Sequence, residues 1–211
     1  MDVKELHSIY AFGYGLFIYS PSIFNEWVHE KKCRAKKMLS CLDRHNDLFL
    51  EMIAKGIALP IYPIATYRYP IFIAQEEPIE TPREWEEVFC HKSWFIRIGT
   101  DDKLCVSSFE FFNAHKDLIA QSQCVFTDKI FDIDNTPHLF YHSDETQMPE
   151  GNYRFDVCGL RRKHPYPETD KENWNRNYAY LFAFQKVESD NNENIERCDN
   201  DTHVFDIEQF N

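Results

Sequence analysis

The chain has 211 residues and carries 35 acidic against 23 basic side chains, a formal net charge of −12 at pH 7. Hydrophobic residues make up 43% of it, which excludes a disordered protein, and the acidic balance disfavours nucleic acid and anionic membranes as partners. Neither G-x-x-x-x-G-K-[ST] nor G-x-G-x-x-G occurs, so no glycine-rich phosphate loop is expected.

The first sixty residues predict a mixed, mainly helical segment. Residues 9–19, IYAFGYGLFIY, are typical of a strand, with Gly13 and Gly15 at a bend. A helix is expected from Pro21, because Ser20 can cap it and apolar residues follow at helical spacing. Helical patterns continue through residues 36–56, where Gly56 is a suitable stop.

Beyond residue 60 most patterns indicate strands. Residues 57–74 read as a strand interrupted by prolines, and the Thr81/Glu84 pair predicts a short capped helix ending near Phe89. Residues 93–108, SWFIRIGTDDKLCVSS, alternate on both sides of a turn and predict a β-hairpin. Its inward side chains are expected to be Trp94, Ile96, Ile98, Leu104 and Val106. A short helix over 109–121 and strands over 124–134, 137–144, 152–160 and 178–187 follow.

These patterns predict an α+β fold, a predominantly antiparallel β-sheet with a helical N-terminal quarter. A single domain, 1–211, is expected, with a helical or mixed part over about 1–60, a β-rich part over about 61–187 and an acidic tail over about 188–211. Residues 186–211 hold eight acidic against two basic side chains, which gives this tail a net charge of −6.

The seven cysteines include no C-x-x-C pair, and most have apolar neighbours. This usage fits a reducing cytoplasm, so all seven are expected to be unpaired thiols. The N-terminus, MDVKELHSIY, carries charges where a signal peptide is apolar, and no stretch approaches the ~20 apolar residues of a membrane span.

No catalytic or metal-binding motif stands out. His138 and His142 share a strand face but lie about 13 Å apart by strand rise, and Cys90 and His91 point to opposite faces. G-x-S-x-G is absent. We therefore expect no metal, no cofactor and no catalytic residue.

Two groups of residues are candidates for binding a partner. Residues 161–177 form a long connection between two predicted strands, and long loops are often functional, although a solvated loop is the alternative. Arginine and aromatic residues are enriched in interfaces, which singles out Arg161, Arg162, Tyr166 and Trp174 in this loop. The second group is acidic and consists of Asp128, Asp132, Asp134, Asp144 and Glu145, together with the tail.

In overall character the chain resembles bacterial immunity proteins. The resemblance rests on an acidic, aromatic-rich, single-domain α+β make-up and on segments such as ALPIYPIATYRYPIFI and MPEGNYRFDVCG. It implies a non-enzymatic cytoplasmic inhibitor of a cognate toxin. Many such toxins are nucleases with basic surfaces, which an acidic partner suits. The alternatives are a small-molecule-binding module with an aromatic-lined pocket and, less favoured, an unrecognised enzyme.

Overall fold

The computed structural model describes residues 3–75, 79–131, 134–188 and 205–210. The strands are β1 (Lys4–Tyr10), β2 (Leu16–Tyr19), β3 (Ala58–Ile61), β4 (Arg68–Ala74), β5 (Trp85–Ile98), β6 (Lys103–Ser108), β7 (Phe126–Phe131), β8 (Pro137–Gln147), β9 (Gly151–Arg162) and β10 (Tyr178–Val187). The helices are α1 (Pro21–Glu30), α2 (Met38–Leu42), α3 (Asn46–Ala54), α4 (Phe109–Ala114) and α5 (Lys116–Ala120), with short 3-10 turns η1 (Trp174–Arg176) and η2 (Ile207–Phe210). No helix in these ranges is long and apolar enough to cross a membrane.

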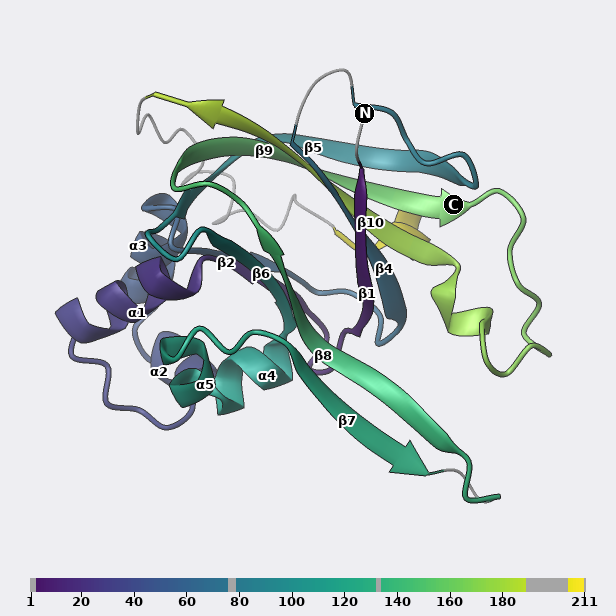
Figure 1. Ribbon diagram of the computed structural model, residues 1–211, viewed down its shortest axis with the longest axis horizontal. Coiled ribbons are helices and arrows are strands. Elements are labelled where there is room, and N and C mark those ends of the chain that lie inside the picture. The colour runs from purple at the N-terminus through teal and green to yellow at the C-terminus, as the bar shows by residue number, and fades with distance from the viewer. Residues whose placement is uncertain (1–2, 76–78, 132–133, 189–204, 211) are drawn as a thin grey trace.

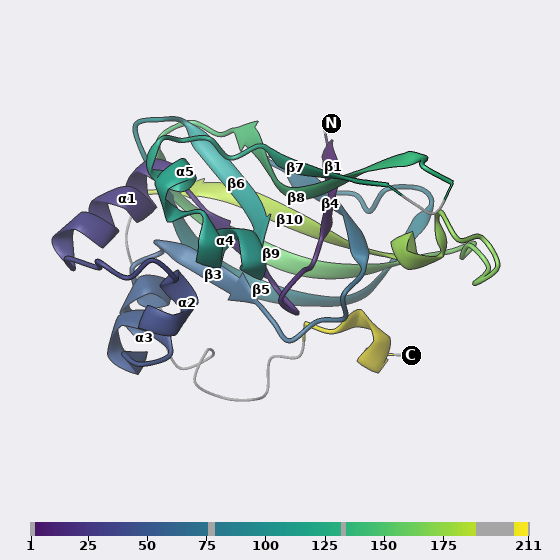
Figure 2. The same cartoon turned by 90° about the horizontal axis from the view of Figure 1, so that it is seen from below.

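The strands form one strongly curved sheet in the order β3-β2-β6-β8-β1-β4-β10-β9-β5, with β7 paired to β8 beside this path (Figures 1 and 2). Its two ends nearly meet. The Arg97 amide of β5 donates to the carbonyl of Gly56, just before β3, at 2.9 Å. Gly56 has a φ of +61°, and a Cβ there would lie 2.5 Å from the Phe95 ring, so glycine permits this close approach. The result is a barrel-like sheet with a packed interior.

The expected α+β class with a helical N-terminal quarter is wrong. Strand accounts for 43% of the structure and helix for 23%. Three helices do lie between residues 21 and 54, but β1 and β2 precede them and α4 and α5 follow at 109–120. The sheet is also mixed, since β1 runs parallel to β8 and β4 parallel to β10. Local patterns predicted the helices at residues 21–54, but the barrel is built from strands that precede and follow these helices in the chain.

The predicted hairpin over residues 93–108 is correct in its burial and wrong in its pairing. All five side chains expected to face inward are buried. However, β5 pairs with β9, whereas β6 pairs with β2 and β8. Alternation determines which face of a strand is buried and leaves open which strand lies beside it. The capped helix expected over residues 81–89 is also wrong, because β5 begins at Trp85 and its pairing with β9 overrides the local cap signal.

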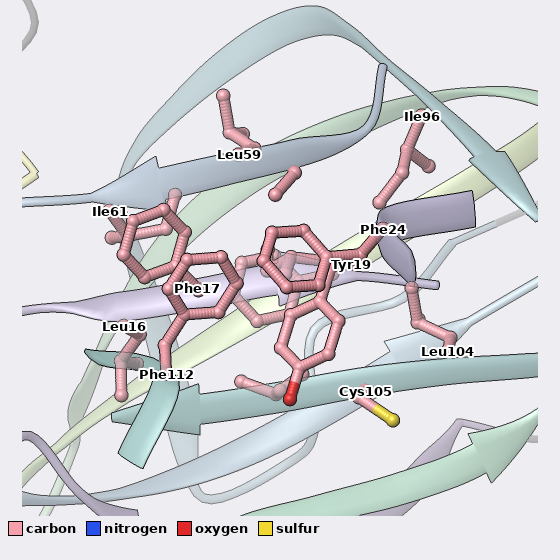
Figure 3. Close-up of a cluster of buried hydrophobic side chains, with 14 of the residues drawn as sticks. Leu16, Phe17, Tyr19, Phe24, Leu59, Ile61, Ile96, Leu104, Cys105 and Phe112 are labelled. Carbon is pink, nitrogen blue, oxygen red and sulfur yellow. The ribbon is translucent and has the colours of Figure 1, made fainter. Parts of the chain in front are cut away.

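Aromatic side chains fill the barrel interior. Phe17 of β2 stacks on Phe112 of α4 with ring centroids 3.9 Å apart, and Phe24 of α1 packs against the same ring at 4.7 Å. Figure 3 shows these rings gathered with Tyr19, Leu59, Ile96 and Leu104 between the strands and the helices. The helices α1 and α4 therefore cover one end of the barrel and bury their apolar faces there.

The C-terminal residues 205–210 complete the core. Phe205 and Ile207 are buried, and the hydroxyl of Tyr180 donates to the Phe205 carbonyl at 2.7 Å. The hydroxyl of Tyr67 donates to the Glu208 carboxylate at 2.7 Å. Burial raises the pKa of Tyr67, and the hydrogen bond to this carboxylate raises it further. This part of the predicted acidic tail is therefore an integral part of the fold. Residues 189–204 lie outside the described residues.

Four of the seven cysteines form two disulfides, Cys90–Cys158 and Cys105–Cys124. The first joins β5 to β9 at directly opposed positions, with the two Cα atoms 4.0 Å apart. Cys33 and Cys41 are unpaired, and Cys198 lies outside the described residues. The expectation of seven unpaired thiols is therefore wrong for four of them, because strand pairing brings together cysteines that have no characteristic spacing in the sequence.

We expect a peptide map of the unreduced protein to contain both cross-linked pairs. Reduction should lower the free energy of unfolding by about 2–4 kcal/mol, because it reopens a closed loop in the unfolded chain. Mass spectrometry after alkylation without reductant, together with urea titrations with and without reductant, measures both effects. Alkylated Cys90 and Cys158 in the native, unreduced protein would contradict the pairing.

Candidate functional site

A two-stranded arm projects from the barrel. β7 pairs with β8 between Phe126 and Phe131, and the far end of this pair extends beyond the rest of the sheet (Figure 1). Among the described strands, β7 pairs only with β8, so its outer edge presents backbone groups that no strand covers. Such an edge is available to a binding partner.

The arm holds large apolar side chains in solvent. Leu139 lies opposite Lys129 and Phe131 lies opposite Pro137 in the register of the two strands. Opposed residues share a face, as do residues two apart on one strand, so Phe131 and Leu139 lie on the same face of the arm. Their exposed fractions are 55% and 48%. Two large apolar groups on one face, away from the core, form a surface that a protein partner can bury.

Acidic residues lie along the same arm. Asp128 is exposed on β7, and Asp134 is exposed at the turn between the strands. The Asp128 Oδ2 lies 3.1 Å from Nε2 of the buried His142, but without the angle that a hydrogen bond requires. The His142 ring packs between Phe12 and Phe126, with centroids 5.1 and 5.7 Å away. The base of the arm is thus anchored in the body, while the Asp128 charge remains at the surface.

Asp144 is not available to a partner, because it is buried and holds β1 to β8. Its Oδ2 accepts from the backbone amide of His7 at 2.8 Å and lies 2.9 Å from His7 Nδ1. β1 and β8 share a single bridged backbone position, Ile9 with Tyr141, so these side-chain bonds reinforce the seam. The exposed His7 ring also stacks on Tyr141 at 3.9 Å.

The His7–Asp144 pair resembles part of a hydrolytic triad in its geometry. A triad also needs a nucleophile hydrogen-bonded to the other ring nitrogen. In the described part of the chain, no side chain bonds to His7 Nε2.

The structure places the remaining acidic candidates differently from one another. Glu145 forms an ion pair with Lys103 at 2.8 Å, with both side chains about three-quarters covered. Asp132 lies outside the described residues. Of the five acidic candidates, Asp128 and Asp134 are therefore the ones that the structure shows exposed on the arm.

Two of the three arginines in the 161–177 loop, Arg161 and Arg162, already form ion pairs with carboxylates. Arg161 forms an ion pair with Glu86 at 2.7 Å, and Arg162 forms one with Glu84 at 2.5 Å. The Arg162 guanidinium also lies between the Trp85 and Tyr166 rings, 4.7 and 4.6 Å from their centroids. These contacts fasten the start of the loop to β5.

The rest of the loop is held by its own bonds. Asn177 accepts from the Tyr166 amide at 2.8 Å and donates to the Tyr166 carbonyl at 2.9 Å. Trp174 packs edge-on against Tyr67 at 5.8 Å and remains 40% exposed. The loop and the arm are thus separate surfaces, and the structure does not bring the two groups of candidates together into one site.

Among the described residues, two clusters combine possible metal ligands, Glu87 with Cys90 and Cys158, and Glu145 with Cys105 and Cys124. In both clusters the two sulfurs are bonded to each other, so they carry no thiolate to ligate a metal. A single carboxylate remains in each cluster.

A surface hollow of about 550 Å³ lies between α1 and α5. It is lined mainly by polar and basic residues, among them His29, Lys32, Arg34 and Lys116. The aromatic side chains that the small-molecule alternative required instead pack on one another inside the barrel.

No family model and no curated protein matches this chain. A solved structure described as crocagin biosynthetic gene J aligns with 86% of this chain and 96% of its own, at 8% identity and a TM-score of 0.40. A likeness this weak supports no conclusion about fold or function.

Sequence reasoning identified the acidic residues of the arm but missed Phe131 and Leu139. Both lie in alternating strand patterns, which ordinarily indicate a face turned to the core. The missing information was that the β7–β8 pair extends past the barrel, where neither face is fully covered.

Proposed function

We propose that this chain is a protein-binding module that contacts a basic partner through the β7–β8 arm. The observation that carries the proposal is the exposure of Phe131 and Leu139 on one face of an arm that also bears Asp128 and Asp134. Apolar anchors supply most of the energy of a protein interface, and complementary charge speeds encounter. A net charge of −12 favours a basic partner.

The specific form proposed is an inhibitor, in keeping with the resemblance to bacterial immunity proteins. The partner would then be a basic toxin domain, and binding would block its active surface. The alternative binding surface is the 161–177 loop, where Trp174 is exposed. The arm is preferred because the two candidate arginines of the loop, Arg161 and Arg162, are paired with Glu86 and Glu84.

A cytoplasmic location is part of this proposal, and the two disulfides count against it. Disulfides are rare in the reducing cytoplasm and common in oxidising compartments. The cysteine state of protein taken directly from its cell, trapped by acid and alkylation, tests the location. Reduced Cys90 and Cys158 would support a cytoplasmic inhibitor. A Cys90–Cys158 disulfide in the trapped protein would mean that it meets its partner in an oxidising compartment.

The binding surface can be tested by placing a photo-crosslinking amino acid at Leu139 or at Trp174 in the full chain. These two positions have similar exposed fractions, 48% and 40%, on the arm and on the loop. After irradiation in source cells, we expect a cross-link to a basic protein from position 139 and none from position 174. Cross-linking from position 174 alone would assign the surface to the loop.

The partner identified by cross-linking is then purified by itself and used as the analyte for surface plasmon resonance. Charge reversal of Asp128 and Asp134 together should slow its association about tenfold at low salt, and this difference should shrink as salt screens the charges. Leu139→Ser should speed dissociation. Arg161→Gln, which changes the loop and not the arm, is the control and should leave both rates unchanged. An unchanged association rate for the charge-reversed variant would refute the basic partner. If the partner keeps its full activity when it is saturated with this protein, inhibition is refuted.

A further inference from the structure

Arg68 and Arg176 lie beside β1, and no described acidic side chain forms an ion pair with either of them. Arg68 begins β4, where it lies opposite Tyr10 of β1, and Arg176 ends η1 just before β10. By contrast, Arg161 and Arg162 each form an ion pair with a carboxylate. Among the described residues, neither Arg68 nor Arg176 forms an ion pair, although the protein carries twelve more acidic than basic charges.

The Arg176 guanidinium is partly buried and poorly satisfied. Its terminal nitrogens make two long hydrogen bonds, 3.5 Å to Asn173 Oδ1 and 3.4 Å to the Ser8 hydroxyl. Its Nε is buried and has no partner within the described structure. A buried donor without a partner is costly, so such a group in a folded protein calls for an explanation.

Further polar groups lie close to Arg176. Asn175 donates to the Tyr10 hydroxyl at 2.7 Å, and its own Oδ1 is buried without a described partner. Arg68 lies opposite this tyrosine on β4, and its pKa is lowered by burial and then by the charge of Arg176. Tyr10 and Glu172 oppose this effect more weakly. Two like charges near each other, with neither of them in an ion pair, favour the binding of an anion.

We propose that Arg68 and Arg176, with the hydroxyl of Ser8, bind the phosphate group of a small phosphate monoester. Two guanidinium groups match a dianion, whereas a carboxylate would neutralise only one of them. Arginine recognises phosphate oxygens through charge-assisted, often bidentate hydrogen bonds. The Trp174 ring, which packs against Tyr67 next to Arg68 in the chain and is 40% exposed, offers an apolar surface to the organic part of the ester. This site lies on β1, β4 and η1 and is independent of the proposed protein contact.

The test uses inorganic phosphate and phenyl phosphate in isothermal titration calorimetry, with sodium chloride at matched ionic strength as the blank. We expect saturable binding of both to the full chain, tighter for phenyl phosphate. Arg176→Gln and Arg68→Gln should each weaken it about tenfold or more. Arg161→Gln, which removes a paired arginine, and Arg34→Gln, in the basic hollow between α1 and α5, should leave it unchanged. Circular dichroism establishes that every variant is folded.

The charge of the ligand provides a second readout. The second pKa of a phosphate group lies near 6, so binding should weaken from pH 7.5 to pH 5, while sulfate, a dianion at both, should bind equally. Phosphate binding that survives both arginine substitutions, or that is lost in Arg34→Gln, would overturn the site. Equal affinity for the two phosphates would overturn the assignment to an ester.

Discussion

Replacing Phe205 with alanine is expected to lower the free energy of unfolding by about 3–5 kcal/mol, the usual cost of truncating a buried phenylalanine. The Phe205 side chain is 4% exposed and lies near Trp94 and His91, with ring centroids 5.9 and 5.4 Å away. It enters the core from the C-terminal end of the chain, so its loss leaves a cavity that the barrel strands cannot readily close. Chemical denaturation followed by tryptophan fluorescence measures the change.

Phe210→Ala provides the matched control in the same segment. Phe210 is 41% exposed and contacts Phe89 at 4.8 Å, so its truncation should cost within about 1 kcal/mol. If Phe205→Ala cost no more than this control, residues 205–210 would not be part of the core.

Ile96→Ala should be destabilising by about 2–5 kcal/mol. Ile96 is fully buried on β5, opposite Tyr153 of β9, and it lies where the two ends of the sheet approach each other at Gly56. Truncation therefore removes packing at the closure of the barrel as well as at a strand pair. Figure 3 shows its side chain directed into the aromatic core.

The measurement is again a urea titration, with Val125→Ala as the control. Val125 is 54% exposed next to the arm, so its truncation should change the free energy of unfolding by about 0.5 kcal/mol or less. A loss below about 1 kcal/mol for Ile96→Ala would mean that the register of β5 is wrong.

Local features of the fold could be predicted from the sequence, because they depend on neighbouring residues alone. The helix from Pro21, the stop at Gly56 and the buried face of residues 94–106 are all found in the structure. Partners across the sheet could not be predicted. β1 lies between β8 and β4, and β5 lies beside β9, pairings that join residues far apart in the chain.

The same limit applied to the candidate site. Opposite charges meet at Arg161 and Glu86 only because β5 and β9 are in that register, so the loop appeared freer in the sequence than it is. Asp144 is buried because His7, far away in the chain, supplies two hydrogen bonds. Exposure of Phe131 depends on how far the arm extends, which no local pattern encodes.

The position of β1 in the sheet has a consequence for synthesis of the protein. β1 precedes both of its neighbours in the chain: one of them, β4, ends at residue 74 and the other, β8, ends at residue 147. The other neighbour of β4 is β10, which spans residues 178–187 and is made later still. The sheet therefore cannot grow outward in the order of translation, and distant pairings of this kind form slowly. Until β8 and β10 have been made, the edge of β1 that faces β8 and the edge of β4 that faces β10 stay unpaired, and unpaired strand edges make a nascent chain prone to aggregation.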